Sequence, residues 1–169
     1  MASQSPRRRA LLESIGIRAE VVPSEFNEKS VNANGFEAGD LAAALAQGKV
    51  RAVAAKYPKD LILGADTIVV LDGQILGKPK NHADATEMLE RLSGRTHSVY
   101  TGLAVYEPKA ESITSDYDCT YVFMDELSED EIKWYVGTGE PMGKAGSYAI
   151  QGTAALFITK ILGDYTSVI

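Results

Sequence analysis

The sequence predicts a single α/β domain whose strands run in mixed directions. Stretches with helical spacing of apolar residues alternate along the chain with apolar, strand-like stretches. The chain has 169 residues, 45% of them hydrophobic, which is enough for one sizeable core and short for two domains. No internal repeat or linker-like segment interrupts the pattern. We therefore expect one domain over residues 1–169.

The first predicted elements follow from local signals near the N-terminus. Ser5 and Pro6 predict a helix start, because serine is a favoured N-cap and proline is favoured at the first helical position. The helix is expected over 7–15, with Gly16 as its end. The next expected elements are a short strand, a loop and an alanine-rich helix, at residues 17–23, 27–39 and 40–56.

The middle and end of the chain predict a hairpin followed by further helices and strands. Residues 61–70 have the composition of a buried strand, and Asp72-Gly73 is typical of a two-residue hairpin turn into 74–76. Later elements are a helix over about 85–92, strands at 97–106 and 115–124, a helix opened by a capping box at Ser128–Glu131, a glycine-rich loop at 137–146, and strands at 148–151 and 155–161.

One face of the strand at 115–124 is expected to be covered. Tyr117, Cys119, Tyr121 and Phe123 alternate with polar or smaller residues, and alternate residues of a strand point to the same face. The sequence therefore places these four side chains on the covered side of the sheet.

Composition excludes several classes of function. The net charge of −6 argues against bulk binding to nucleic acid or to anionic membranes. Cys119 is the single cysteine and only two histidines are present, so neither a disulfide framework nor a zinc site is expected, and a reducing cytoplasm fits. The residues after the arginines at 7–9 are mixed and charged, unlike a secretion signal, and the apolar run at 61–71 is too short to span a membrane.

Asp66 is the first candidate for chemistry. A carboxylate within an apolar strand costs several kcal/mol unless it is paired, hydrogen-bonded or bound to a metal. A strand end at Asp66 is the structural alternative, but the apolar residues continue through 68–71, which favours a functional carboxylate. Lys78 follows the hairpin strand closely and is a candidate cation, although a solvated turn lysine is the commoner case.

The three arginines at 7–9 are the second candidate. Cations are unfavourable at a helix N-terminus, which itself attracts anions through its free N–H groups. Together with Ser3 and Ser5, the guanidinium groups of Arg7 and Arg8 would suit a polyphosphate, whose oxygens arginine binds in pairs. The alternative is a solvated basic turn whose side chains pack on their neighbours. A strand aspartate able to hold a divalent cation favours polyphosphate chemistry.

Several short motifs lie in order along nearly the whole chain. They are residues 2–8 (ASQSPRR), 64–69 (GADTIV), 76–79 (LGKP), 92–97 (LSGRTH), 101–102 (TG), 138–141 (TGEP) and 144–152 (KAGSYAIQG). In this order they resemble the Maf family of nucleotide pyrophosphatases. The resemblance implies a two-lobed fold with a mixed, twisted central sheet, helices on its faces and a central cleft. It also implies cytoplasmic hydrolysis of nucleoside triphosphates to monophosphate and pyrophosphate, use of Mg²⁺ or Mn²⁺, and a homodimer as one arrangement.

The resemblance also implies roles for individual residues. Asp66 matches the family's active-site carboxylate, which acts as proton acceptor. Arg7, Thr67 and Gln151 match the three positions that separate substrate subtypes, in the combination of the dTTP and UTP subtype. Relatives that act on 7-methyl-GTP carry other residues there. A glutamine side chain presents both a donor and an acceptor, which suits the edge of uracil or thymine.

Further charged residues complete the implied site. Glu28, Lys49 and Lys78 match charged residues of the family's cleft. The two lysines would offset charge on the transferring group and on the leaving pyrophosphate. Glu28 and Asp66 are the candidates to bind the divalent metal. Phosphate contacts are expected from Arg7 and the helix N-terminus, with Ser3, Ser5 and Arg8 in support.

Two other functions stay open, and so does the extent of the domain. A non-catalytic regulator of septum formation and cell division is one alternative, although a binding module without activity should have lost Asp66 or Lys78. A pyrophosphatase for other, modified nucleotides is the second, because a methyl group changes discrimination by only about 1–3 kcal/mol. We expect the domain to lack the family's usual first-strand residues and its C-terminal helix.

Overall fold

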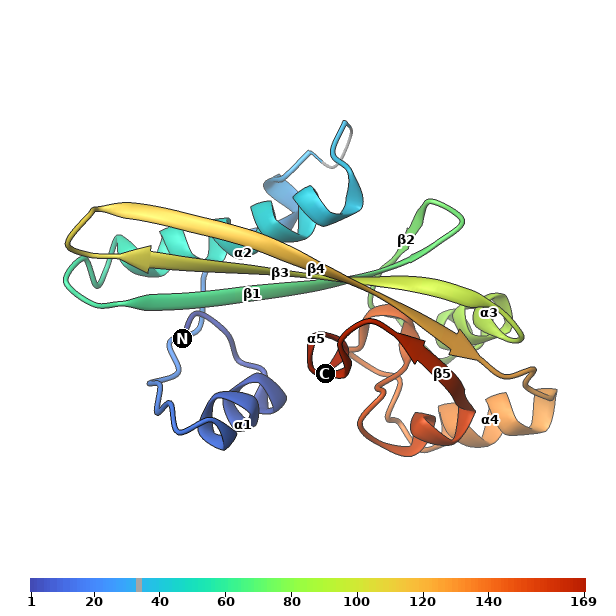
Figure 1. Ribbon diagram of the computed structural model, residues 1–169. Helices are drawn as coiled ribbons and strands as arrows, with labels where there is room; N and C mark the ends of the chain where they lie inside the picture. The colour runs from blue at the N-terminus through green and yellow to red at the C-terminus, as the bar shows by residue number, and fades with distance from the viewer. Residues whose placement is uncertain (33–34) are drawn as a thin grey trace. The chain divides into compact units, whose positions relative to one another are not determined.

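A five-stranded sheet with the strand order β2-β1-β3-β4-β5 runs through the fold (Figure 1). The computed structural model describes residues 1–32 and 35–169, and for Lys29 the backbone alone. The strands are β1 (Ile62–Leu71), β2 (Gln74–Leu76), β3 (Thr96–Glu107), β4 (Ser112–Met124) and β5 (Ile158–Leu162). β2 pairs antiparallel with β1, and β5 pairs antiparallel with β4. The α/β class predicted from the sequence is confirmed.

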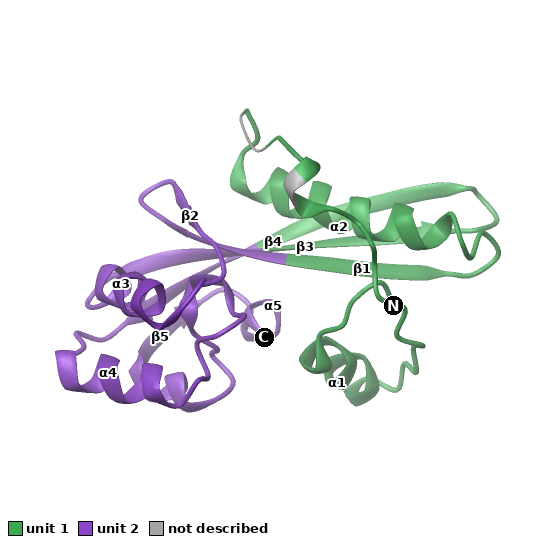
Figure 2. Cartoon of the chain, turned by 180° about the vertical axis from the view of Figure 1, so that it is seen from behind, with its two compact units in different colours: residues 1–66, 101–118 green, residues 67–100, 119–169 purple. Residues whose placement is uncertain are grey.

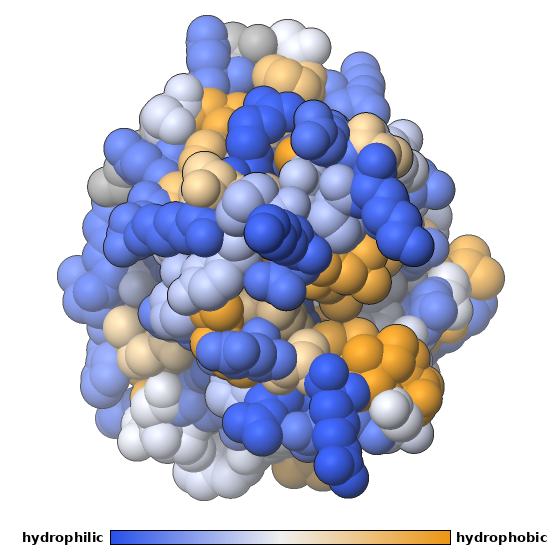
Figure 3. Space-filling model, turned by 90° about the vertical axis from the view of Figure 1, so that its left-hand side faces the viewer, coloured by the Kyte–Doolittle hydropathy of each residue, from blue (hydrophilic) through white to orange (hydrophobic). Residues whose placement is uncertain are grey.

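Helices precede, separate and follow these strands in the chain. They are α1 (Pro6–Ser14), α2 (Ala38–Ala54), α3 (His82–Leu92), α4 (Glu129–Gly137) and α5 (Tyr165–Val168), with short 3₁₀ helices η1 (Glu28–Ser30), η2 (Ala145–Ser147) and η3 (Thr153–Phe157). In the described residues, none of these helices is long and apolar enough to cross a membrane. Hydrophilic side chains cover much of the face shown in Figure 3, with hydrophobic ones in separate groups among them.

The chain divides into two compact units (Figure 2). Unit 1 comprises residues 1–66 and 101–118, and unit 2 comprises residues 67–100 and 119–169. The single domain over 1–169 and the central cleft stay predictions.

In unit 1, α2 packs directly on the backbone of the strands. Its buried face includes Ala46, Val50 and Val53, which join Ile62 of β1 in one apolar cluster. A Cβ atom at Gly64 would lie 2.6 Å from a methyl group of Val50, and one at Gly102 would overlap the carbonyl group of Ala42. Because these two residues of β1 and β3 are glycines, α2 can lie closer to the strands than it could with a side chain at either position.

The N-terminal part of unit 1 begins as predicted and then departs from the prediction. Ser5 caps α1, its hydroxyl accepting a hydrogen bond from the backbone N–H of Arg8 at 3.4 Å, and Gly16 ends the turn after α1 with φ of 80°. The strand expected at 17–23 is wrong. Val22 N–H donates to the carbonyl oxygen of Met1 (3.0 Å), while Ala2 N–H donates to Leu63 of β1 (2.7 Å). The first two residues of the chain therefore connect Val22 to β1 by single hydrogen bonds, and residues 17–23 form no strand.

The segment predicted as a loop over 27–39 contains more structure than expected. It includes η1 over Glu28–Ser30, and α2 already begins at Ala38. Ala33 and Asn34, which belong to the same prediction, lie outside the described residues.

In unit 2, the core lies between the sheet and the helices α3 and α4. Its largest buried side chains include Leu89 and Leu92 of α3, Tyr135 of α4 and Val122 of β4. The turn predicted at 72–73 is present, with φ of 51° and 74°, and joins β1 to β2 in the expected hairpin. The predicted capping box at the start of α4 is also confirmed.

The predicted covered face of β4 is wrong. Thr120, Val122 and Met124 are buried, whereas Tyr117 and Tyr121 are 43% and 45% exposed. The hydroxyl of Thr120 accepts a hydrogen bond from Asp164 N–H at 2.9 Å, so a polar side chain can be buried there without loss. The inward face of this strand is thus the one that looked more polar in the sequence.

The two last predicted strands also need correction. Residues 148–151 form no strand, and the stretch predicted at 155–161 is η3 followed by β5. The backbone N–H groups of Thr153 and Ala154 are bound by the carboxylate of Glu140 rather than by a neighbouring strand. A side chain distant in the sequence therefore decides the backbone conformation here.

The close approach of α2 to β3 predicts a strong effect of one added methyl group. We expect Gly102→Ala to destabilise the protein by about 3 kcal/mol, because the methyl group meets helix backbone that cannot rotate away. This corresponds to a fall in Tm of roughly 6–12 °C for a chain of this size. The matched control is Gly137→Ala in α4, where a Cβ meets no atom within 4 Å and Tm should hold or rise. Equal Tm values for Gly102→Ala and wild type would contradict this packing argument.

Candidate active site

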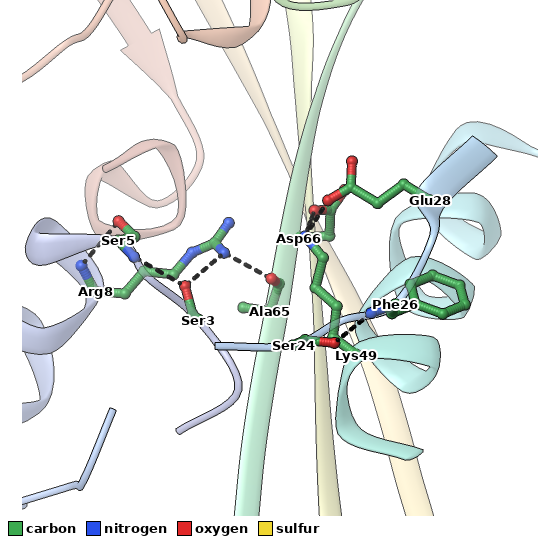
Figure 4. A network of polar contacts seen from close by, with 9 residues as sticks. All are labelled: Ser3, Ser5, Arg8, Ser24, Phe26, Glu28, Lys49, Ala65 and Asp66. Carbon is green, nitrogen blue, oxygen red and sulfur yellow. Dashed lines mark hydrogen bonds and ion pairs between the residues drawn. The ribbon is translucent and has the colours of Figure 1, made fainter. Parts of the chain in front are cut away.

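Asp66 is a buried carboxylate in the middle of β1, and it is paired. Its side chain contacts Nζ of Lys49, which extends from α2, and the same ammonium lies 2.8 Å from Oε1 of Glu28 (Figure 4). The strand continues to Leu71, so the alternative of a strand end at Asp66 is wrong. The ammonium compensates a charge that would otherwise be costly to bury.

Local packing brings both partners to Asp66. Lys49 is delivered by the close approach of α2 that Gly64 and Gly102 allow. Glu28 follows a segment that is held by Phe26, whose ring occupies the place of a side chain at Gly48 on α2. The hydroxyl of Ser24 also accepts a hydrogen bond from Phe26 N–H at 3.1 Å.

Phe26 and Gly48 are site-building residues that the sequence analysis missed. A glycine inside an otherwise alanine-rich helix was the available signal, since such a glycine often marks a close packing contact.

Arg8 lies on the other side of β1, as Figure 4 shows. Its Nη1 donates to the carbonyl oxygen of Ala65 at 2.6 Å and to the hydroxyl of Ser3 at 3.4 Å. Burial lowers the pKa of the Arg8 guanidinium, and neighbouring Arg7 lowers it further, while the charges of Asp66 and Glu28 oppose the shift. Arg8 thus ties α1 to the strand residue that precedes Asp66.

The other members of the basic cluster have different surroundings. Arg9 forms an exposed ion pair with Glu13 one turn along α1 (2.8 Å), which is the solvated alternative considered for these arginines. Arg7 is partly buried in the first turn of α1. Ser3 accepts hydrogen bonds from Ser5 N–H and from Arg8, and Ser5 caps α1, so both hydroxyls help to build this turn. Phosphate binding by these residues stays a prediction.

A divalent metal fits the carboxylates of this site. Glu28 and Asp66 converge on a single cation, the ammonium of Lys49. Mg²⁺ is commonly bound by one or two carboxylates, with water and substrate phosphates as its other ligands. Within residues 1–32 and 35–169, no three His, Cys, Asp or Glu side chains gather closely enough to hold a metal alone. Glu28 and Asp66 could therefore supply two of the ligands of such a metal.

The remaining candidates belong to unit 2. Thr67 follows Asp66 directly on β1 and is partly buried. Lys78 and Gln151 are exposed, and among the described residues neither side chain has a hydrogen-bond partner. The N–H of Gly146 donates to the carbonyl oxygen of Gly77 at 3.1 Å, which joins the residue before Lys78 to the segment that leads to Gln151.

Residues 1–169 match the family described as Maf-like protein. The chain belongs to the Maf family. A protein of Bacillus cytotoxicus is 50% identical over 169 residues, which cover 100% of this chain and 86% of that protein. Proteins of Symbiobacterium thermophilum and Geobacter sp. (strain M21) are each 48% identical over the same length and are covered to 85% and 86%. All three are named dTTP/UTP pyrophosphatase. The family resemblance stated from the motifs is confirmed.

In this Maf chain, the Lys49 ammonium should contribute strongly to stability. We expect Lys49→Met to destabilise the protein by about 3 kcal/mol, the low end for breaking a buried ion pair, because Glu28 is 45% exposed. The double variant Lys49→Met/Asp66→Asn should recover part of this loss, since it no longer buries an uncompensated carboxylate. Urea unfolding of the wild type, the two single variants and the double variant gives the coupling free energy between Lys49 and Asp66.

Lys56→Met is the matched control for this measurement. Lys56 follows α2 and pairs with Glu25 at 2.8 Å, but both side chains are largely exposed. Its replacement should leave the unfolding midpoint almost unchanged. A Lys49→Met variant as stable as the wild type would contradict the assigned role of the ammonium.

Proposed function

We propose that the protein hydrolyses nucleoside triphosphates, with dTTP and UTP as substrates, to nucleoside monophosphate and pyrophosphate. The observation that carries this proposal is the buried Asp66, which lies in mid-strand with Lys49 and Glu28 around it. Relatives that match the whole chain at 48–50% identity are named for this activity.

The proposed reaction is attack by water on the α-phosphorus. The bond between this phosphorus and the oxygen that bridges to the β-phosphate breaks, and pyrophosphate leaves with that oxygen. Asp66 accepts the proton of the attacking water. Arg7 and the N-terminus of α1 bind phosphate oxygens, while Lys49 and Lys78 offset the charge of the reacting and leaving groups.

Glu28 and Asp66 are the residues that would hold a divalent cation. Bound there, Mg²⁺ or Mn²⁺ supplies neutralisation of phosphate charge and polarisation of the phosphoryl group. A divalent cation bound there would contact two carboxylates, whose negative charges attract it.

Base recognition is assigned to Gln151, with Thr67 shaping the site. The exposed amide of Gln151 offers one acceptor and two donor hydrogens, which fit the alternating carbonyl and N–H groups of uracil or thymine. The cytoplasm as location and a homodimer remain further parts of this proposal. Regulation of septum formation without catalysis and action on modified nucleotides are the alternatives that the experiments below distinguish.

The first test is Asp66→Asn. The nearly isosteric amide keeps the shape of the site but cannot accept the proton, so pyrophosphate release from dTTP and UTP should fall about 10²–10⁴-fold. The assay measures pyrophosphate and orthophosphate separately, with added Mg²⁺ or Mn²⁺. Asp72→Asn is the matched control, because Asp72 is an exposed turn residue paired with Arg95 and should be dispensable for activity. Full activity in a folded Asp66→Asn variant would refute the catalytic assignment.

The second test is Gln151→Glu, which replaces the amide by an acceptor-only carboxylate. The carboxylate should repel the carbonyl groups of uracil and accept from the N–H groups of a guanine-type edge. Since an unsatisfied polar group costs about 1–3 kcal/mol, the ratio of kcat/KM for UTP to that for 7-methyl-GTP should fall about ten- to a hundredfold. An unchanged ratio would show that Gln151 does not read the base. Gln74→Glu on the exposed strand β2 controls for the added charge.

A further inference from the structure

The carboxylate of Glu140 accepts three hydrogen bonds close in sequence to Gln151 and at the end of α4. Its Oε2 accepts from the backbone N–H of Thr153 at 3.0 Å. Its Oε1 accepts from the backbone N–H of Ala154 at 3.3 Å and from the hydroxyl of Tyr135 at 3.0 Å. Both amides belong to η3, which begins two residues after Gln151. A single carboxylate thus fixes the backbone that follows the proposed base-reading residue.

The carboxylate also lies against Gly152, the residue between Gln151 and η3. A Cβ atom at Gly152 would be only 2.7 Å from Oε1 of Glu140, so any side chain there would displace the carboxylate. Partial burial acts to raise the pKa of Glu140, but the bonds from Thr153, Ala154 and Tyr135 outweigh it and hold the pKa below its usual value. Glu140 is therefore ionised at neutral pH and acts only as an acceptor.

The backbone before Gln151 has its own anchor. The hydroxyl of Tyr148 lies 2.6 Å from Nε2 of His97 on β3, and the two rings meet edge to face at 5.3 Å. Both side chains are buried, and burial lowers the pKa of His97 to about 4, so its ring is neutral at pH 7. Gln151 is therefore an exposed residue between two anchored positions, Tyr148 before it and the amides bound by Glu140 after it.

We propose that Glu140 is a positioning residue for base recognition, which orients the Gln151 amide by fixing the backbone at residues 152–154. The inference rests on the proposed function, because it takes Gln151 as the residue that contacts the base. Glu140 itself uses both oxygens for protein contacts and takes no part in the attack on the α-phosphorus. Its loss should consequently affect nucleotide binding and selectivity more than the chemical step.

Glu140→Gln is the decisive variant. The amide group of glutamine can keep one acceptor, but its NH₂ would face a backbone N–H. At least one of the two hydrogen bonds from the backbone N–H groups of Thr153 and Ala154 is therefore lost. We expect KM for dTTP and UTP to rise about tenfold, kcat to change less than twofold, and the preference for UTP over GTP to fall. Hydrogen exchange at the amides of Thr153 and Ala154 should accelerate in the same variant.

Two controls separate positioning from general damage. Glu131→Gln makes the same substitution in the capping box of α4, where Glu131 binds Ser128 and not residues 152–154, and should leave KM and selectivity unchanged. Tyr135→Phe removes only the hydrogen bond from the tyrosine hydroxyl to Glu140 and keeps the two hydrogen bonds from the backbone N–H groups. It should retain the wild-type preference for UTP even where its Tm falls.

The outcomes distinguish this inference from the proposed function. Activity of the wild type on UTP upholds the proposed function. The inference about Glu140 is overturned if Glu140→Gln leaves KM and selectivity unchanged. It is also overturned if kcat falls equally for UTP and GTP while KM stays constant. If wild type releases no pyrophosphate from dTTP or UTP, the proposed function fails. Binding of the non-hydrolysable α,β-imido-dUTP then decides: weaker binding by Glu140→Gln than by Glu131→Gln supports positioning, and equal binding or none by wild type overturns it.

Discussion

The burial of Asp66 within β1 is the constraint on which unit 1 depends. A carboxylate at this place requires a cation, and Lys49 can supply it only if α2 lies directly on the strands. Gly64 and Gly102 make that approach feasible, because a Cβ atom at either would meet the helix. The charge balance around Asp66 therefore depends on the packing of α2 against the strands. Any change that lifts α2 from the sheet should weaken both.

The same arrangement explains why a site of this kind is tolerated at all. An ion pair with limited exposure contributes little net stability, because desolvation offsets most of the attraction between the charges. Lys49 pairs with two carboxylates, of which Glu28 is partly exposed. A core of apolar residues would be at least as stable. Under the proposed function, the charge of this cluster would be fixed before substrate arrives and would require no reorganisation during the reaction.

Local signals in the sequence were sufficient wherever neighbouring residues decide the structure. Ser5 and Pro6 predicted the start of α1, Asp72-Gly73 predicted the hairpin, and the apolar residues after Asp66 predicted that the strand continues through this carboxylate. The failures share a different cause. The inward face of β4 depends on the bond from Asp164 to Thr120, and the backbone after Gln151 depends on Glu140. These partners are 44 and 13 residues away in the sequence from the groups they bind. The spacing of apolar residues within one helix or strand does not predict such contacts.

The basic N-terminus of α1 combines a structural role with a proposed functional one. Three successive arginines at this end of a helix are unfavourable by charge alone. Within unit 1, Arg8 donates to the strand beside Asp66, and Arg9 pairs with Glu13. Arg8 holds the start of α1 against β1, one residue before Asp66. The helix N-terminus that would bind phosphate and the carboxylate that would accept the proton are thus fixed to the same strand. Their relative position then depends on the strand rather than on a flexible loop.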